Sequence, residues 1–115
     1  MFEDKDWVFR RATEADADAV RDLVRAVYGK YVAAMGRESR PMTADYIAAI
    51  ENHQVWIVEE GGEILAVLVL IAEPDAMTLE NVAVSERLQG RGVGSRLLVF
   101  AEAEAARQGY DEILL

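Results

Sequence analysis

The chain of 115 residues is long enough for one domain, because a chain of this size buries roughly 65% of its unfolded surface on folding. It has no cysteine and one histidine, which excludes disulfides, a thiolate nucleophile and a metal site built on thiolates or clustered histidines. A net charge of −9 disfavours nucleic acid and anionic membranes as partners, since most of the surface would repel phosphate. We expect a cytoplasmic protein, because the first residues lack a signal-peptide pattern and no apolar run could span a bilayer.

The first half of the chain predicts one strand and two helices. Asp6–Arg11 has the alternation of a short strand. Thr13 has the position of an N-cap, and apolar residues then recur at spacings of three and four as far as Tyr31, which is typical of an amphipathic helix of about four turns. After a loop, we expect Thr43 to cap a second, shorter helix.

The middle of the chain predicts a β-hairpin. Val55–Glu59 is rich in β-branched and aromatic residues, and two glycines in Glu60–Glu63 separate it from the apolar run Ile64–Ile71. Because this run does not alternate with polar residues, we expect a central strand that is covered on both faces. The stretch Pro41–Glu86 has no lysine or arginine, which would suit a cationic substrate or simply a soluble surface.

The stretch from Leu79 onward combines a strand, a glycine loop and a helix. Leu79–Val84 is the predicted strand, and apolar residues recur at helical spacing from Val93 until Gly109 ends the helix. Between them stand three glycines at alternate positions: Gly90, Gly92 and Gly94. Glycines allow positive φ and close approach of a ligand, and the first N–H groups of a helix have no internal partner, so this loop predicts an anion site.

Local arginines favour a phosphate as the anion: Arg87, Arg91 and Arg96. A P-loop is disfavoured, because Gly94 is followed by Ser95 rather than by lysine. The glycine spacing does not fit the dinucleotide-binding fingerprint either.

The segment Gln89-Gly90-Arg91-Gly92-Val93-Gly94 resembles the Gln/Arg-x-x-Gly-x-Gly/Ala loop of the GNAT superfamily of acyl-CoA-dependent N-acetyltransferases. Leu79–Val84 resembles the fourth strand of that family. The resemblance implies an α/β (α+β) fold with a mixed, mostly antiparallel sheet, helices on both faces, and a parallel strand pair that splays apart at the glycine loop. It also implies acetyl-CoA as co-substrate, with the pyrophosphate on the loop amides and the pantetheine arm on the strand. The implied cofactor-binding residues are Val82, Ala83, Val84, Gln89, Gly90, Arg91, Gly92, Val93, Gly94 and Ser95.

Acetyl transfer requires a neutral amine, so a general base is needed, and Glu80 on the family-like strand is the candidate. Several GNAT families carry their base at the matching position. Tyr28, Tyr31 and Asn81 are candidate substrate residues by the same resemblance. The structural alternatives are core packing for the tyrosines and an ordinary polar strand position for Asn81.

The resemblance covers residues 1–115 as a single domain that is incomplete at its C-terminal end, since the family continues with another helix and two strands. We expect Asp111–Leu115 to begin a strand parallel to Leu79–Val84 and to present a bare edge, with Ile113 and Leu115 exposed, that could pair with a second copy. The sequence thus predicts an N-acetyltransferase acting on an amine of a small molecule or peptide. Two alternatives are a non-catalytic coenzyme A binding module and an interaction protein that pairs through its last strand.

Overall fold

The computed structural model describes residues 6–35 and 45–115, and it describes the side chains of all of these except residues 30–35. In chain order the elements are β1 (Trp7–Arg11), a 3₁₀ turn η1 (Glu14–Asp16), α1 (Ala17–Met35), α3 (Tyr46–Asn52), β2 (Gln54–Glu60), β3 (Glu63–Ala72), β4 (Met77–Val84), a 3₁₀ turn η2 (Glu86–Leu88), α4 (Val93–Arg107) and β5 (Ile113–Leu114).

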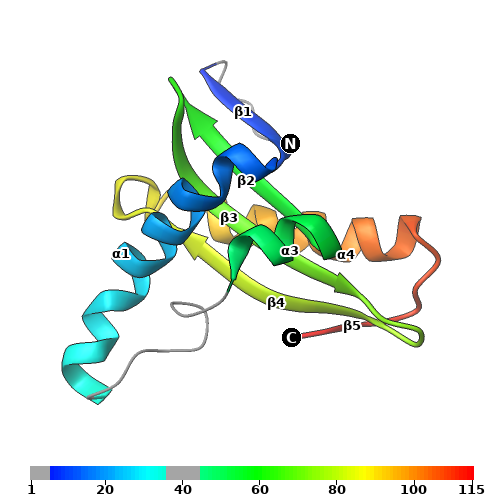
Figure 1. Cartoon of the computed structure of the whole chain (residues 1–115). Helices are drawn as coiled ribbons and strands as arrows, with labels where there is room; N and C mark the ends of the chain where they lie inside the picture. The colour runs from blue at the N-terminus through cyan, green and yellow to red at the C-terminus, as the bar shows by residue number, and fades with distance from the viewer. Residues whose placement is uncertain (1–5, 36–44) are drawn as a thin grey trace.

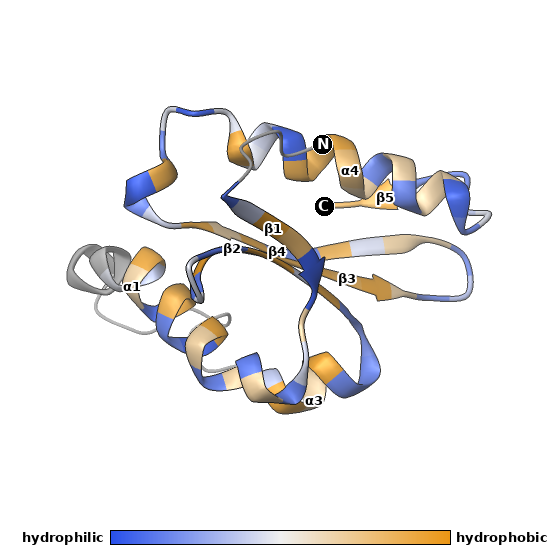
Figure 2. Cartoon of the chain, turned by 90° about the horizontal axis from the view of Figure 1, so that it is seen from above, coloured by the Kyte–Doolittle hydropathy of each residue, from blue (hydrophilic) through white to orange (hydrophobic). Residues whose placement is uncertain are grey.

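The described strands form one sheet in the order β1-β2-β3-β4-β5, as Figure 1 shows. Neighbouring strands are antiparallel except β4 and β5, which are parallel. Helix α4 covers one face of this sheet, and α1 and α3 cover the other (Figure 2). The predicted mixed, mostly antiparallel sheet with helices on both faces is confirmed.

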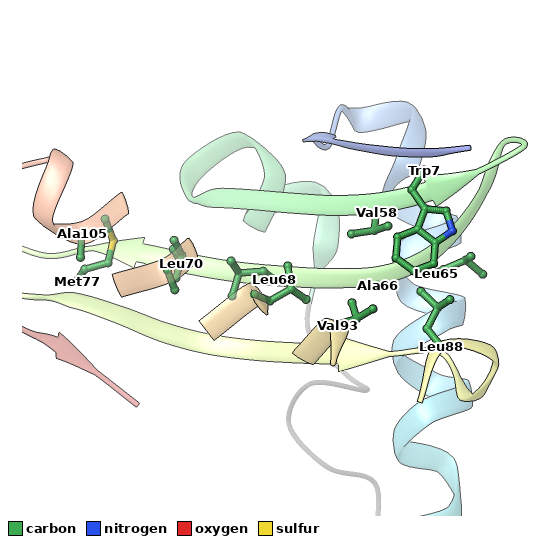
Figure 3. Packing of buried hydrophobic residues seen from close by; sticks show 12 residues of the cluster. Trp7, Val58, Leu65, Ala66, Leu68, Leu70, Met77, Leu88, Val93 and Ala105 are labelled. Atoms are coloured by element: carbon green, nitrogen blue, oxygen red, sulfur yellow. The ribbon is translucent and has the colours of Figure 1, made fainter. Parts of the chain in front are cut away.

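Strand β3 carries the core on both sides of the sheet. Leu68 and Leu70 pack with α4 residues such as Leu97, whereas Val67 and Val69 pack on the side of α1 and α3. Figure 3 shows part of the cluster on the α4 side, with Leu68 and Leu70 beside Val93 and Met77. The unbroken apolar run in the sequence is explained by this two-sided burial.

The glycines at chain reversals adopt the conformations that their positions require. Gly61 and Gly62 both have positive φ, 59° and 86°, which is the backbone of a two-residue type I′ hairpin turn. Gly109 has φ 90° after α4. There the N–H of Tyr110 donates to the carbonyl of Ala105 at 2.9 Å, as in a Schellman motif, so the predicted helix stop is confirmed.

The residues before the first helical turn and before α3 show how the two helical segments begin. Thr13 does precede the first helical turn, and its N–H donates to the carboxylate of Asp16 at 2.8 Å. Thr43, the predicted cap of the second helix, lies outside the described residues; Asp45 caps α3, and its side chain accepts from the N–H of Ala48 at 3.1 Å. Asp45 stands directly before the helix and three residues before Ala48, which is the spacing that a capping carboxylate needs.

The parallel pairing of β5 with β4 is confirmed, and it is short. Only Met77 and Thr78 of β4 have partners on β5. From Leu79 onward, β4 has no strand on this side among the described residues, so the pair is splayed. Ile113 is half-buried against the α4 side of the core, contrary to the expected bare edge, whereas Leu115 is 89% exposed. Pairing of this edge with a second copy stays a prediction.

None of the described helices is both long enough and apolar enough to cross a bilayer.

An ion-pair cluster fastens the first strand to the start of α1. The Arg10 guanidinium lies 2.9 Å from a carboxylate oxygen of Asp16 and 2.8 Å from one of Glu59. Hydrogen bonds from Arg10 lower the pKa of Asp16 from 3.8 to about 2, against an opposing effect of burial. Since the pKa is depressed in the folded state, this stabilisation is present above about pH 4 and is lost as the pH falls towards 2.

We predict that Asp16→Asn lowers the free energy of unfolding at pH 7 by about 1–2 kcal/mol, because the amide loses the charged partner of Arg10. The difference from wild type should shrink as the pH falls from 5 to 2. Urea unfolding at several pH values measures both effects. A difference that stays constant down to pH 2 would show that the charge of Asp16 does not stabilise the fold.

Candidate active site

A β-bulge in β4 places Glu80 at the surface. Asn81 lies opposite Val69 and Leu79 lies opposite Leu70, which leaves Glu80 without a partner on β3. An extra residue of this kind shifts the side-chain alternation of a strand by one. Leu79 therefore packs on the α4 side, whereas Asn81, two residues later, hydrogen-bonds on the side of α1 and α3.

The backbone of β4 after the bulge has a defined direction. The N–H of Ser85 donates to the carbonyl of Leu65 on β3 at 2.8 Å. In an antiparallel ladder every second residue bonds the same neighbour, so Ala83 also turns its backbone groups towards β3, and Val82 and Val84 turn theirs away. Because β5 pairs only with the first two residues of β4, Val82 and Val84 face an edge that carries no strand in the described chain.

The glycine loop joins the end of β4 to α4 (Figure 1). Leu88 and Val93 are almost fully buried and fix its two ends. Between them Gly90 and Gly92 have φ of 80° and 77°, left-handed values that favour glycine, and Gly92 is the N-cap of α4.

The first turn of α4 offers backbone donors. The first intrahelical bond runs from the N–H of Arg96 to the carbonyl of Gly92, at 3.1 Å. Within the described residues, no hydrogen bond occupies the N–H groups of Val93, Gly94 or Ser95. These donors at the positive end of the helix dipole form a place for an anion.

The arginines near the loop are only partly available to a ligand. Arg87 forms ion pairs with Glu63 and, at 3.6 Å, with Glu60, both on the β2–β3 hairpin. The Arg91 guanidinium lies over the indole ring of Trp7, 5.3 Å from its centre. The sequence predicted that all of them would favour phosphate, but Arg87 is held by carboxylates and Arg91 contacts an aromatic face. Arg96 is exposed, and no ion pair involves it among the described residues.

A hydrogen-bond network joins three elements next to the bulge. The hydroxyl of Tyr28 on α1 lies 3.0 Å from Oδ1 of Asn81 and 3.1 Å from the main-chain oxygen of Val82. Asn81, only 5% exposed, donates from Nδ2 to the hydroxyl oxygen of Tyr46 on α3, at 3.1 Å. The structure thus brings Tyr28 and Asn81 together, and their role as substrate residues stays a prediction. The side chain of Tyr31 lies outside the described residues.

Tyr46 on α3 also belongs to this network. Burial raises its pKa to about 12, a hydrogen bond from Asn81 acts in the opposite direction, and the negative charge of nearby Glu80 adds to the rise. Its hydroxyl therefore stays protonated near neutral pH.

Comparison with known proteins identifies the family. The sequence profile of the acetyltransferase (GNAT) family matches residues 17–115, and the chain belongs to this family. A search of curated proteins found no match in sequence.

Solved structures with similar folds include several acetyltransferases. An IAA acetyltransferase from Bacillus cereus ATCC 14579 has 23% identity and a TM-score of 0.67, over 93% of this chain and 63% of that one. An aminoglycoside N-acetyltransferase in complex with CoA has 14% identity and a TM-score of 0.70, over 99% of this chain and 78% of that one. A possible acetyltransferase from Clostridium difficile 630 has 13% identity and a TM-score of 0.76, over 95% and 78%. At these identities the similarity establishes the fold.

We predict that Tyr46→Phe lowers the free energy of unfolding by about 1–3 kcal/mol, because it leaves Nδ2 of buried Asn81 without its acceptor. Adding Asn81→Leu should then cost less than it does in the wild-type background, since the unsatisfied amide is removed as well. Denaturant unfolding of the two single variants and the double variant measures this coupling. Strictly additive effects would argue against the hydrogen bond.

Proposed function

We propose that the protein is an acetyl-CoA-dependent N-acetyltransferase that transfers the acetyl group to an amine of a small molecule or peptide. The observation that supports this most is a series of backbone groups, close together in the chain, that have no partner strand or helical hydrogen bond among the described residues. It runs from Val82 and Val84 on the open edge of β4 to the amides of the first turn of α4. Glu80 lies at the other end of this series, in the bulge.

The proposed orientation of coenzyme A follows the order of these groups along the chain. Its pyrophosphate would lie on the loop amides from Gln89 to Ser95, where the helix start and glycine backbone suit an anion. Its pantetheine arm would extend along the open edge of β4, with its amides pairing with Val82 and Val84. Ala83 lies between these two and contributes a side chain that is 1% exposed on the opposite face of the strand.

Glu80 is the proposed general base. At neutral pH an amine with a pKa near 10.4 pays roughly 4–5 kcal/mol to lose its proton. Glu80 is exposed on the bulge, so its carboxylate can reach an incoming ammonium and take that proton, directly or through a water. The thioester supplies the acetyl group. The acidic residues of α3 and β4 suit an acceptor amine that arrives with a positive charge.

We predict that Gly94→Val weakens acetyl-CoA binding about tenfold or more without loss of fold. A Cβ at Gly94 would lie 3.9 Å from Cγ2 of Val84, an ordinary contact, while the larger side chain would fill the angle between β4 and the helix start. Gly94 is a better test position than Gly92, where the φ of 77° makes any side chain strained. Isothermal calorimetry with acetyl-CoA measures the effect.

The matched control is Gly29→Val on α1, where an added Cβ meets no atom within 4 Å. This variant should bind acetyl-CoA as the wild type does. Equal affinities for all three proteins would place the cofactor elsewhere.

We predict that Glu80→Gln lowers kcat at neutral pH by about 10²–10⁴, because the amide keeps the shape of the side chain and cannot accept the proton. Acetyl-CoA affinity should barely change. The assay follows free thiol release with a panel of primary amines: benzylamine, cadaverine and an alanyl peptide. Glu102→Gln, an exposed site on α4, is the control. Wild-type protein that binds acetyl-CoA and acetylates no amine would instead indicate a non-catalytic coenzyme A binding module.

A further inference from the structure

Arg91 connects the middle of the glycine loop to the first strand of the sheet. Its guanidinium lies over the indole ring of Trp7 on β1, 5.3 Å from the centre of the ring. The residues on either side of it, Gly90 and Gly92, have no side chains that could hold this part of the loop. Arg91 is therefore the residue between them that can fasten the loop to the rest of the fold.

The indole ring of Trp7 is itself held in place by packing and by a hydrogen bond. Trp7 is 9% exposed and belongs to the same core cluster as Leu65 and Leu88, which Figure 3 shows beside it. Its Nε1–H donates to a carboxylate oxygen of Glu60 at 2.8 Å. A ring that is already ordered in this way offers its face to Arg91 at little further cost in side-chain entropy.

The β2–β3 hairpin also holds the segment that precedes the loop. Glu60 and Glu63, which pair across the hairpin turn, both form ion pairs with Arg87 of η2. Since Arg87 precedes Gly90 and Arg91 follows it, the chain is connected to neighbouring strands on both sides of this glycine. The ion pairs also offset the charge of the two carboxylates, which would otherwise repel a phosphate that approaches the loop.

We propose that Trp7 is a positioning residue for coenzyme binding, which through Arg91 holds the glycine loop in the conformation that receives the pyrophosphate. This inference rests on the acetyl-CoA binding that is part of the proposed function. A loop with two left-handed glycines loses much conformational entropy when it becomes ordered, and ordering it only on binding would lower the affinity. The contact between Trp7 and Arg91 orders the loop before the ligand arrives.

The test is Trp7→Leu in the whole chain, which keeps an apolar side chain and removes the aromatic face. We expect the Kd for acetyl-CoA, measured by calorimetry, to rise about 3- to 10-fold, as for the loss of one cation–π contact. Trp7→Phe keeps an aromatic face under Arg91, so its Kd should stay within about twofold of the wild-type value.

Hydrogen exchange in the ligand-free proteins tests the positioning directly. The N–H of Arg91 donates to the carbonyl of Leu88 at 3.3 Å, so its exchange rate reports how often the loop opens. Exchange at this amide should be faster in Trp7→Leu than in wild type, and it should return to about the wild-type rate in Trp7→Phe.

The matched control is Trp56→Leu. The Arg11 guanidinium lies over the ring of Trp56, 5.2 Å from its centre, and Trp56 packs against the same core cluster as Trp7. This variant therefore removes an equivalent contact between arginine and tryptophan, but Arg11 belongs to β1 rather than to the loop. The Kd for acetyl-CoA and the exchange at Arg91 should remain those of the wild type.

Three results would overturn the inference. One is an unchanged Kd in Trp7→Leu, and another is weaker binding that Trp7→Phe does not restore. The third is an equal rise of the Kd in Trp56→Leu, which would assign the loss to general destabilisation of the core. Wild-type protein that binds no acetyl-CoA would reject the proposed function itself, a distinct outcome that the wild type alone reveals.

Arg91→Met keeps the inference testable if Trp7→Leu fails to fold. This variant leaves the core unchanged and removes the cation from the face of Trp7. We expect weaker acetyl-CoA binding together with faster exchange of the amide at position 91 in the ligand-free protein. Weaker binding with unchanged exchange would make Arg91 a direct phosphate contact instead, and would contradict the positioning by Trp7.

Discussion

The candidate site depends on the single extra residue in β4. Without Glu80 the alternation of the strand would continue unchanged from Leu79, and Asn81 would point to the α4 side of the sheet instead of towards α1 and α3. The backbone of Val82 and Val84 would also turn towards β3 and be used up in the ladder. The bulge therefore turns the backbone of Val82 and Val84 away from β3, exposes the carboxylate of Glu80 and buries the amide of Asn81.

In the proposed function the open edge of β4 acts together with the start of α4, because the glycine loop that leads to α4 follows the end of β4. The buried side chains of Leu88 and Val93 hold the loop against the core, while the left-handed backbone at Gly90 and Gly92 turns the chain into α4. Among the described residues, no hydrogen bond occupies the first amides of α4, which follow this turn. The proposed coenzyme A, with a charged end and an extended amide-bearing arm, would match this combination of helix start and open strand edge.

The buried network between α1, β4 and α3 has an energetic cost that the fold offsets. Burying an amide such as that of Asn81 is unfavourable unless each polar atom finds a partner, and here both ends of the amide are bonded to tyrosine hydroxyls. Such a network can be satisfied in few arrangements, so it specifies how α1 and α3 pack on β4. A purely apolar contact at this point would tolerate sliding of α1 or α3 along β4.

The sequence by itself determined most of the elements and the glycine loop, because these depend on patterns within a few neighbouring residues. The unbroken apolar run of β3 predicted its two-sided burial, Gly61-Gly62 predicted the hairpin, and the alternating glycines predicted an anion site at a helix start. Only the tertiary structure decided which groups face a ligand. The bulge at Glu80 exists as a register between two strands, and a register is a property of the pair.

Long-range contacts also decided the availability of individual side chains. Arg87 is captured by Glu63 of the hairpin, 24 residues earlier in the chain. Asn81 is joined to Tyr28, 53 residues away. Neither contact leaves a signature in the local sequence, since the partners meet only after the sheet and its helices have packed. The physical reason is that spacing along the chain encodes which face of an element is apolar, while hydrogen bonds between elements depend on where those faces finally meet.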